Sequence, residues 1–126
     1  MAKKTVLIVD DEKLIRTLLH HYCAQNDFEV VEAENGQEAL QRINAECPDL
    51  VIMDVMMPGI NGLHVARRIR KSFDKNQLPI LFLTSESDSQ TRYEAIAAGA
   101  QVFLTKPISL GDLLKSIRQL TADQPG

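Results

Sequence analysis

The sequence contains no tryptophan, and it has only two cysteines among its 126 residues. Cys23 and Cys47 form no C-x-x-C pair, so we expect both to pack as small hydrophobic residues in a reducing compartment rather than bind metal or form a disulfide. No apolar run is long enough to cross a bilayer. The opening segment "MAKKTVLIVDDE" has a short apolar run before its acids, so we expect no signal peptide. These absences predict a cytoplasmic protein without membrane contact.

The chain also lacks an excess of positive charge, with a net charge of −3 and a pI near 5.6. Binding nucleic acid by electrostatics requires basic surface, so we expect no direct nucleic-acid binding. Hydrophobic residues make up 44% and charged residues 25%, as in ordinary globular proteins. No internal repeat or low-complexity tract is present. We therefore expect one domain over residues 1–126, with a core at about 5–120 and a polar tail or shortened linker at 121–126.

Five short apolar segments alternate with longer helical patterns. The segments cover residues 5–9, 28–33, 50–53, 80–83 and 101–104. Within them, "VLIV", "LVIM" and "ILFL" are continuously apolar, as is typical of parallel strands covered on both faces. The second segment, "FEVVEA", is more polar and suits an edge strand.

Apolar residues at helical spacing occupy the intervals between these segments. The clearest stripes are Leu14, Ile15, Leu18, Leu19 and Tyr22, and Leu110, Leu113, Leu114, Ile117 and Leu120; shorter ones are Ala39, Leu40 and Ile43, and Leu63, Ala66 and Ile69. Ser87 with Gln90 is a candidate capping box for the helix that carries Tyr93 and Ile96, and Gly99 is placed to end that helix. Strands that alternate with helices predict an α/β fold with a doubly wound, parallel five-stranded sheet and right-handed crossovers.

Acidic residues follow two of the buried segments. Asp10 and Asp11 follow the first, and Asp54 follows the third. Helix capping explains one or two acids, but ligands of open α/β sheets bind outside the carboxyl ends of neighbouring strands, where these acids would converge. Two unit charges about 4 Å apart repel by roughly 4 kcal/mol at an effective dielectric near 20, so such a cluster requires a cation. Oxygen ligands favour Mg²⁺, or Mn²⁺ in its place.

Two further polar residues follow the fourth and fifth segments. Thr84 comes directly after "ILFL", and Lys106 comes after "VFLT" and before Pro107. A hydroxyl and an ammonium beside a metal-bound carboxylate suit a phosphoryl group, because they neutralise and hydrogen-bond its oxygens while a carboxylate attacks phosphorus. Taken singly, Thr84 could be an ordinary strand-end hydroxyl, Lys106 a solvated charge and Asp54 a turn residue.

Four sequence blocks together resemble the receiver domain of two-component response regulators. They are "VLIVDDEK", "PDLVIMDVMMPGINGL", "LPILFLTSES" and "GAQVFLTKPI", and the resemblance runs from about residue 5 to 120. It implies a flavodoxin-like (βα)₅ fold with strand order 2-1-3-4-5, in which the first and third strands are neighbours. Receivers of this family are well-known examples of that strand order.

The resemblance also implies roles for the acidic residues. Asp54 would be the phosphoacceptor, taking a phosphoryl group from a kinase phosphohistidine as an acyl phosphate and later losing it by self-dephosphorylation. Asp11 would bind Mg²⁺ directly, Asp10 mostly through water, and Met56 through its backbone carbonyl. The chain would then be a signalling switch and not an enzyme acting on other substrates.

The remaining site residues are assigned by the same resemblance. Lys106 would pair with one phosphoryl oxygen, Thr84 would move to bond another, and the Lys106–Pro107 bond would be cis although trans is the default for such bonds. Phe103, three residues before Lys106, would be the aromatic residue that turns inward behind Thr84 on activation. Because it lacks the hydroxyl of a tyrosine, we expect it to be buried even before activation. Its plain alternative is core packing.

The resemblance also bears on two positions that vary within the family and on the partner proteins. Met56 and Glu86 could set the lifetime of the acyl phosphate, or vary without consequence. The partners implied are a sensor histidine kinase or a histidine phosphotransfer protein, which would meet the first helix, and a downstream effector protein or a fused output domain. A homodimer formed on phosphorylation is compatible with the family. His20, His21 and His64 have no spacing suited to a metal site.

Three other readings compete with this one. A haloacid-dehalogenase-type phosphatase also phosphorylates an aspartate, but it requires a second aspartate where Met56 stands, and a longer chain. A dinucleotide-binding domain requires G-x-G-x-x-G after the first strand, and "VDDEKL" contains none. A degenerate receiver that only mediates protein contacts is disfavoured because the acidic pair, Asp54, Thr84 and Lys106 are all present.

Overall fold

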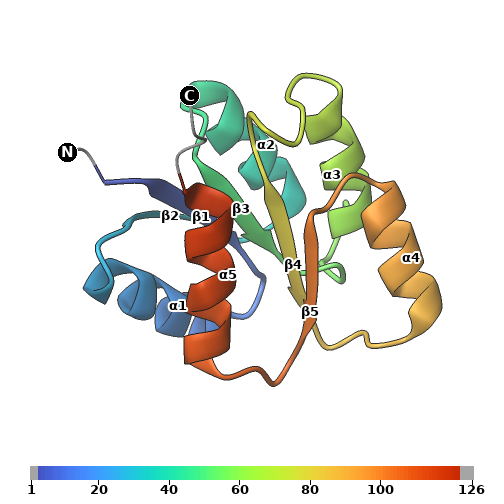
Figure 1. Ribbon diagram of the computed structural model, residues 1–126. Coiled ribbons are helices and arrows are strands. Elements are labelled where there is room, and N and C mark those ends of the chain that lie inside the picture. The colour runs from blue at the N-terminus through green and yellow to red at the C-terminus, as the bar shows by residue number, and fades with distance from the viewer. Residues whose placement is uncertain (1–2, 123–126) are drawn as a thin grey trace.

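The computed structural model describes residues 3–122, which form five strands and five helices in strict alternation (Figure 1). The strands are β1 (Thr5–Val9), β2 (Glu29–Ala33), β3 (Leu50–Met53), β4 (Ile80–Thr84) and β5 (Val102–Thr105). The helices are α1 (Lys13–Gln25), α2 (Gly36–Ala45), α3 (Gly62–Arg70), α4 (Ser89–Ala97) and α5 (Leu110–Thr121). Of the expected polar tail at 121–126, Thr121 is the last residue of α5, and residues 123–126 lie outside the described part.

All five strands are parallel and lie in the order β2-β1-β3-β4-β5. This order confirms the predicted flavodoxin-like α/β fold, and the polar strand β2 is at an edge as expected. The predicted bounds of β1 and β3 match the observed ones, β2 and β4 differ by one residue at one end, and β5 is shifted by one residue at both ends. Because β1 and β3 are neighbours, residues that follow them in the chain lie side by side.

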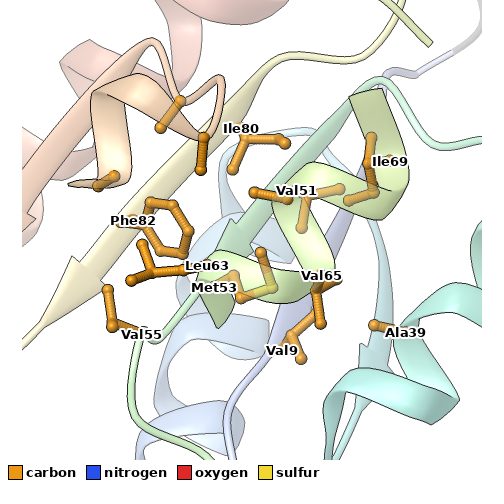
Figure 2. Packing of buried hydrophobic residues seen from close by; sticks show 14 of the residues in the cluster. Val9, Ala39, Val51, Met53, Val55, Leu63, Val65, Ile69, Ile80 and Phe82 are labelled. Atoms are coloured by element: carbon orange, nitrogen blue, oxygen red, sulfur yellow. The ribbon is translucent and has the colours of Figure 1, made fainter. Parts of the chain in front are cut away.

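Helices cover both faces of the sheet, with α1 and α5 on one face (Figure 1). Alternate strand residues face the two layers, because successive side chains of a strand point to opposite sides. Ile8 and Ile52 pack with Leu113 and Ile117 of α5. On the other face, Val9, Met53 and Phe82 pack with residues of α2, α3 and α4, as Figure 2 shows for Ala39, Leu63 and Val65. The sheet is therefore buried on both sides, which explains its continuously apolar strands.

Side chains cap four of the five helices at their N-termini. Asn35, Asn61 and Ser109 each accept a hydrogen bond from the backbone N–H three residues on. The predicted capping box at Ser87 is wrong, because Asp88 caps α4 by accepting the N–H of Thr91 at 2.7 Å. A carboxylate is both an N-cap acceptor and a negative charge at the positive end of the helix dipole, which favours a start one residue later. Gly99, with φ of 109°, ends the helix as predicted.

Two expectations about burial also need correction. Leu14 and Leu18 belong to the apolar stripe of α1 but are 80% and 50% exposed, because the helix buries Arg16, Leu19 and Cys23 instead. Cys23 is buried as expected, and burial raises the pKa of its thiol to about 11. Cys47 is exposed, because it lies in the turn that follows α2 and not on a packed face.

Within residues 3–122, no helix combines the length and apolar character needed to cross a bilayer.

Candidate phosphoacceptor site

The candidate site lies at the carboxyl ends of β1 and β3, where two aspartates follow adjacent strands. Asp10 comes after β1 and Asp54 after β3, and the Asp54 N–H donates to the Val9 carbonyl at 3.2 Å. The two residues are only 3% and 6% exposed. Buried carboxylates are costly unless they are paired and hydrogen-bonded, so their partners decide whether the arrangement is stable.

Lys106, which follows β5, supplies the common partner of both carboxylates. Its Nζ donates to Asp10 Oδ2 and to Asp54 Oδ2, each at 3.0 Å. Burial by itself lowers the pKa of Lys106, but the hydrogen bonds and negative charges of the two aspartates outweigh burial and raise that pKa. The lysine therefore stays protonated and offsets one of the two negative charges that the strands bring together.

The other oxygen of each carboxylate is held by a nearby backbone amide. Asp10 Oδ1 accepts the N–H of Glu12 at 2.9 Å, and Asp54 Oδ1 accepts the N–H of Met56 at 3.0 Å. Each aspartate therefore makes a local turn that fixes its rotamer. An ionised carboxylate has about four acceptor positions, so both retain capacity for a further positive ligand or hydrogen-bond donor.

Thr84 ends β4 beside this group and is fully buried. Its Oγ1 accepts the N–H of Glu86 at 3.3 Å, and its carbonyl accepts the N–H of Lys106 at 2.8 Å. The Lys106–Pro107 bond is cis, in agreement with the family resemblance. A backbone hydrogen bond thus links Thr84 to Lys106, while the threonine hydroxyl accepts a hydrogen bond from the Glu86 amide in the loop that follows β4.

The predicted cluster of three acids is only partly assembled. Asp11 is exposed, and among residues 3–122 no group of three acidic, histidine or cysteine side chains lies close enough to hold a metal ion. Asp10 and Asp54 converge as expected, but Lys106 lies between them and offsets one of their two negative charges. The set of donors, carboxylate oxygens at the open carboxyl edge of a sheet, nevertheless has the chemistry that Mg²⁺ prefers.

Phe103 lies on β5 with 5% of its surface exposed. It belongs to the core layer that contains Phe82, and the Arg92 guanidinium of α4 lies 5.2 Å from the centre of its ring. The burial agrees with the expectation for the unphosphorylated protein. On the same helix as Arg92, Tyr93 and Ile96 are 71% and 45% exposed.

Sequence reasoning missed one residue that contacts the site, Arg16 of α1. Its Nη1 donates to the Asp10 carbonyl at 2.8 Å, and its Nε donates to Glu32 of β2 at 2.8 Å. The available signal was its position on the same helix face as Leu19 and Cys23, where a charged residue requires a partner. Glu32, one of the two acids in the more polar strand β2, was the matching signal.

Comparison with known proteins identifies the family of the chain. Residues 6–118 match the family described as the response regulator receiver domain. The chain is 40% identical over 115 residues to the response regulator MprA of Mycolicibacterium vanbaalenii, covering 91% of this chain and 49% of that protein. It is 37% identical over 106 residues to the alkaline phosphatase synthesis transcriptional regulatory protein PhoP of Bacillus subtilis, covering 84% and 43%. The chain therefore spans about half the length of these relatives.

Solved structures show the same relationship. The chemotaxis protein CheY4 of Vibrio cholerae superposes with a TM-score of 0.88 at 34% identity, covering 94% of this chain and 99% of that one. The N-terminal receiver domain of Klebsiella pneumoniae RstA gives a TM-score of 0.88 at 29% identity, covering 94% and 99%. The match across nearly the whole described fold, together with these relatives, establishes that the chain belongs to the response regulator receiver domains of two-component systems.

Proposed function

We propose that this receiver is a phosphorylation-dependent switch in which Asp54 accepts a phosphoryl group from a phosphohistidine. One observation carries the proposal: the Asp54 carboxylate is held at the end of β3 by the Met56 amide and by a lysine that also binds Asp10. This arrangement orients one carboxylate as a nucleophile and keeps a cation beside it. Helix capping alone would require no lysine shared between two strands.

The proposed transfer has a simple balance of bonds. A carboxylate oxygen of Asp54 attacks phosphorus, the phosphorus–nitrogen bond of the phosphohistidine breaks, and the imidazole leaves with the electron pair and takes up a proton. Lys106 can then pair with a phosphoryl oxygen in place of one carboxylate. In self-dephosphorylation water attacks phosphorus, the acyl phosphate bond breaks, and Asp54 regains its carboxylate as inorganic phosphate leaves.

The same proposal includes a Mg²⁺ or Mn²⁺ ion held by Asp10, Asp11, Asp54 and the Met56 carbonyl. When bound, such an ion would neutralise oxygen charge during the transfer. Asp11 has the exposure that a solvent-accessible ligand requires, and the carboxylates of Asp10 and Asp54 keep acceptor capacity beyond their present hydrogen bonds. Met56 and Glu86, near the rim of the site, would influence the lifetime of the acyl phosphate.

Signal output would involve Thr84 and Phe103. The Thr84 hydroxyl would exchange its Glu86 amide partner for a phosphoryl oxygen, and the buried Phe103 ring would respond to that movement. The readout surface would lie over α4, β5 and α5, where Tyr93 and Ile96 are exposed. Dimerisation through this surface on phosphorylation is part of the proposal.

The receiver would act in the cytoplasm, and the donor of the phosphoryl group would be a sensor histidine kinase or a histidine phosphotransfer protein. Leu14 and Leu18 of α1 and Met56, two residues after Asp54, are exposed apolar side chains, and they would form the contact surface for this donor. Because the relatives are about twice as long, we propose that residues 1–126 form one receiver domain that acts on a fused output domain or a separate effector.

A phosphodonor experiment tests the function directly. The protein is incubated with Mg²⁺ and acetyl phosphate, and intact mass together with peptide mapping locates the product. We expect one acid-stable, base-labile phosphoryl group on Asp54, and none on an Asp54→Asn variant that retains the folded circular dichroism spectrum. Release of phosphate from many esters would favour a phosphatase, and the absence of both labelling and hydrolysis would favour a degenerate receiver.

A further inference from the structure

Arg16 is an unusual residue for the buried face of α1. Its side chain is only 8% exposed, and it shares that face with Leu19 and Cys23. An arginine seldom takes a fully buried position unless it is paired, because removing a guanidinium from water is costly. Its partners therefore indicate what the position requires.

The guanidinium joins the β1–α1 loop to the carboxyl end of β2. Nη1 donates to the Asp10 carbonyl at 2.8 Å, Nε donates to Glu32 Oε1 at 2.8 Å, and Nη2 lies 3.6 Å from Glu34 Oε1. His20 contacts the second oxygen of Glu32 at 2.6 Å. The flat guanidinium fork thus connects the β1–α1 loop with the end of β2, a geometry that a single ammonium cannot reproduce.

The consequence for Asp10 is that its backbone is held on both sides. Its N–H donates to the Ala33 carbonyl at 3.2 Å, and its carbonyl accepts the Arg16 bond. The side chain is then directed to Lys106 and to the Glu12 amide. A change in the Asp10 peptide would move the carboxylate that shares Lys106 with Asp54.

Stability alone does not account for an arginine here. Well-packed apolar side chains often replace buried ion pairs without loss of stability, and Leu19 and Cys23 show that this face is otherwise apolar. An apolar side chain would, however, leave the Asp10 carbonyl without its buried donor. We propose that Arg16 is a positioning residue for phosphoryl transfer, whose fork sets the orientation of Asp10 beside Lys106 and Asp54.

The test compares Arg16→Met and Arg16→Lys with the unmodified protein, and it rests on the proposed function only in part. The rate of Asp54 labelling by acetyl phosphate, the affinity for Mn²⁺ measured by electron paramagnetic resonance, and the amide NMR shift of Glu12 are recorded for each. Loss of an outer-shell partner typically lowers metal affinity or activity by 10–100-fold, so we expect at least about tenfold weaker Mn²⁺ binding and slower labelling for Arg16→Met. Arg16→Lys keeps the charge but not the fork, so we expect a loss of about tenfold for it as well.

Arg42→Met is the matched control, because Arg42 forms a surface pair with Glu38 at 3.7 Å and is half exposed. We expect it to behave as the unmodified protein in all three measurements. If Arg16→Met does not fold, Arg16→Lys decides the question. Variants of Arg16 that lose only thermal stability, with Mn²⁺ affinity and labelling within twofold of the unmodified protein, would overturn the proposal. If the unmodified protein itself is not labelled, the proposed function fails, while Mn²⁺ affinity and the Glu12 shift still test the role of Arg16.

Discussion

Lys106 and Arg70 occupy opposite ends of the sheet, and their hydrogen-bond partners differ in charge. Lys106, after the carboxyl end of β5, donates to the carboxylates of Asp10 and Asp54. Arg70, at the end of α3, donates to backbone carbonyls near the amino ends of β4 and β5, including those of Leu78 and Gly99. One cation lies between ionised side chains, whereas the other lies among largely neutral acceptors.

The Arg70 end is built for close packing. Its Nη2 also donates to Gln101 Oε1, which accepts the Ile80 N–H at 3.0 Å and thereby joins the starts of β4 and β5. A Cβ on Gly99 would lie 2.6 Å from the Arg70 side chain, so glycine is required there for space as well as for its positive φ. Burial lowers the pKa of Arg70, and the nearby Asp74 charge offsets part of that effect.

This difference in partners indicates that the Lys106 end can exchange its ligands, whereas the Arg70 end supports the fold. A lysine between two carboxylates can transfer its interaction to a phosphoryl group, because the replacement also carries negative charge. Carbonyl groups at the ends of strands cannot leave Arg70 without losing partly buried hydrogen bonds. We therefore expect changes at the two ends to affect chemistry and stability separately.

The largest expected effect is on chemistry, from Lys106→Met. Loss of a preorganised cation at the reacting oxygens should slow Asp54 labelling by acetyl phosphate about 100-fold per folded molecule. Labelling rates are measured by mass spectrometry after correction for the folded fraction. A rate within threefold of the unmodified protein would show that Lys106 has no part in the transfer.

Arg70→Met should show the reverse pattern. The substitution keeps an apolar stem but removes the donors of several carbonyl groups, so the free energy of unfolding should fall by about 3 kcal/mol. Urea denaturation followed by circular dichroism measures this loss. The labelling rate of the folded protein should not change, and a rate that fell with stability would remove the distinction between the two ends.

Gly62, the first residue of α3, offers a sharper test of the packing around Asp54 at the carboxyl edge of the sheet. A Cβ on Gly62 would lie 2.3 Å from the Asp54 carbonyl and 2.8 Å from the Phe82 ring. Gly62→Ala should therefore reduce the free energy of unfolding by about 2 kcal/mol, through overpacking, and should shift the amide NMR signal of Asp54.

Gly111, in the first turn of α5, is the control for that substitution. A Cβ there meets nothing within 4 Å, so Gly111→Ala should raise the free energy of unfolding by about 0.5 kcal/mol through helix propensity. Urea denaturation of both variants gives the comparison. Equal effects of the two substitutions would contradict the close packing of α3 on Asp54.

The smallest expected effect concerns Glu32, next to Arg16. Burial tends to raise its pKa, but hydrogen bonds from His20 and Arg16 and their charges lower it overall below 4.5. A lowered carboxyl pKa stabilises the fold above the unfolded value and loses that contribution as pH falls through the folded value. Glu32→Gln should therefore be less stable by roughly 0.5 kcal/mol near pH 7. Thermal unfolding from pH 7 to 3 should show the gap closing below pH about 4.5, and a gap that widened there would contradict this assignment.

Much of the fold was predictable from local patterns. Continuous apolar runs indicated β1, β3 and β4 because strands buried on both faces require them, and Gly99 indicated the end of α4. The N-cap of α4 was misplaced, because Ser87 and Asp88 are adjacent candidates whose competition depends on local geometry. The exposure of Leu14 and Leu18 was also not evident, since helical spacing shows which residues share a face but not which face meets the sheet.

The sequence by itself determined which polar residues follow which strands, and hence that Asp10, Asp54, Thr84 and Lys106 would gather at one edge. Only the tertiary structure decided that Lys106 bonds both Asp10 and Asp54, from which it is separated by 96 and 52 residues. It also decided that Asp11 faces solvent and that Arg16 is buried against the Asp10 carbonyl. Backbone preferences act over a few residues, whereas the partner of a buried charge is set by the packing of distant segments, because only that packing excludes water and brings the opposite charge within reach.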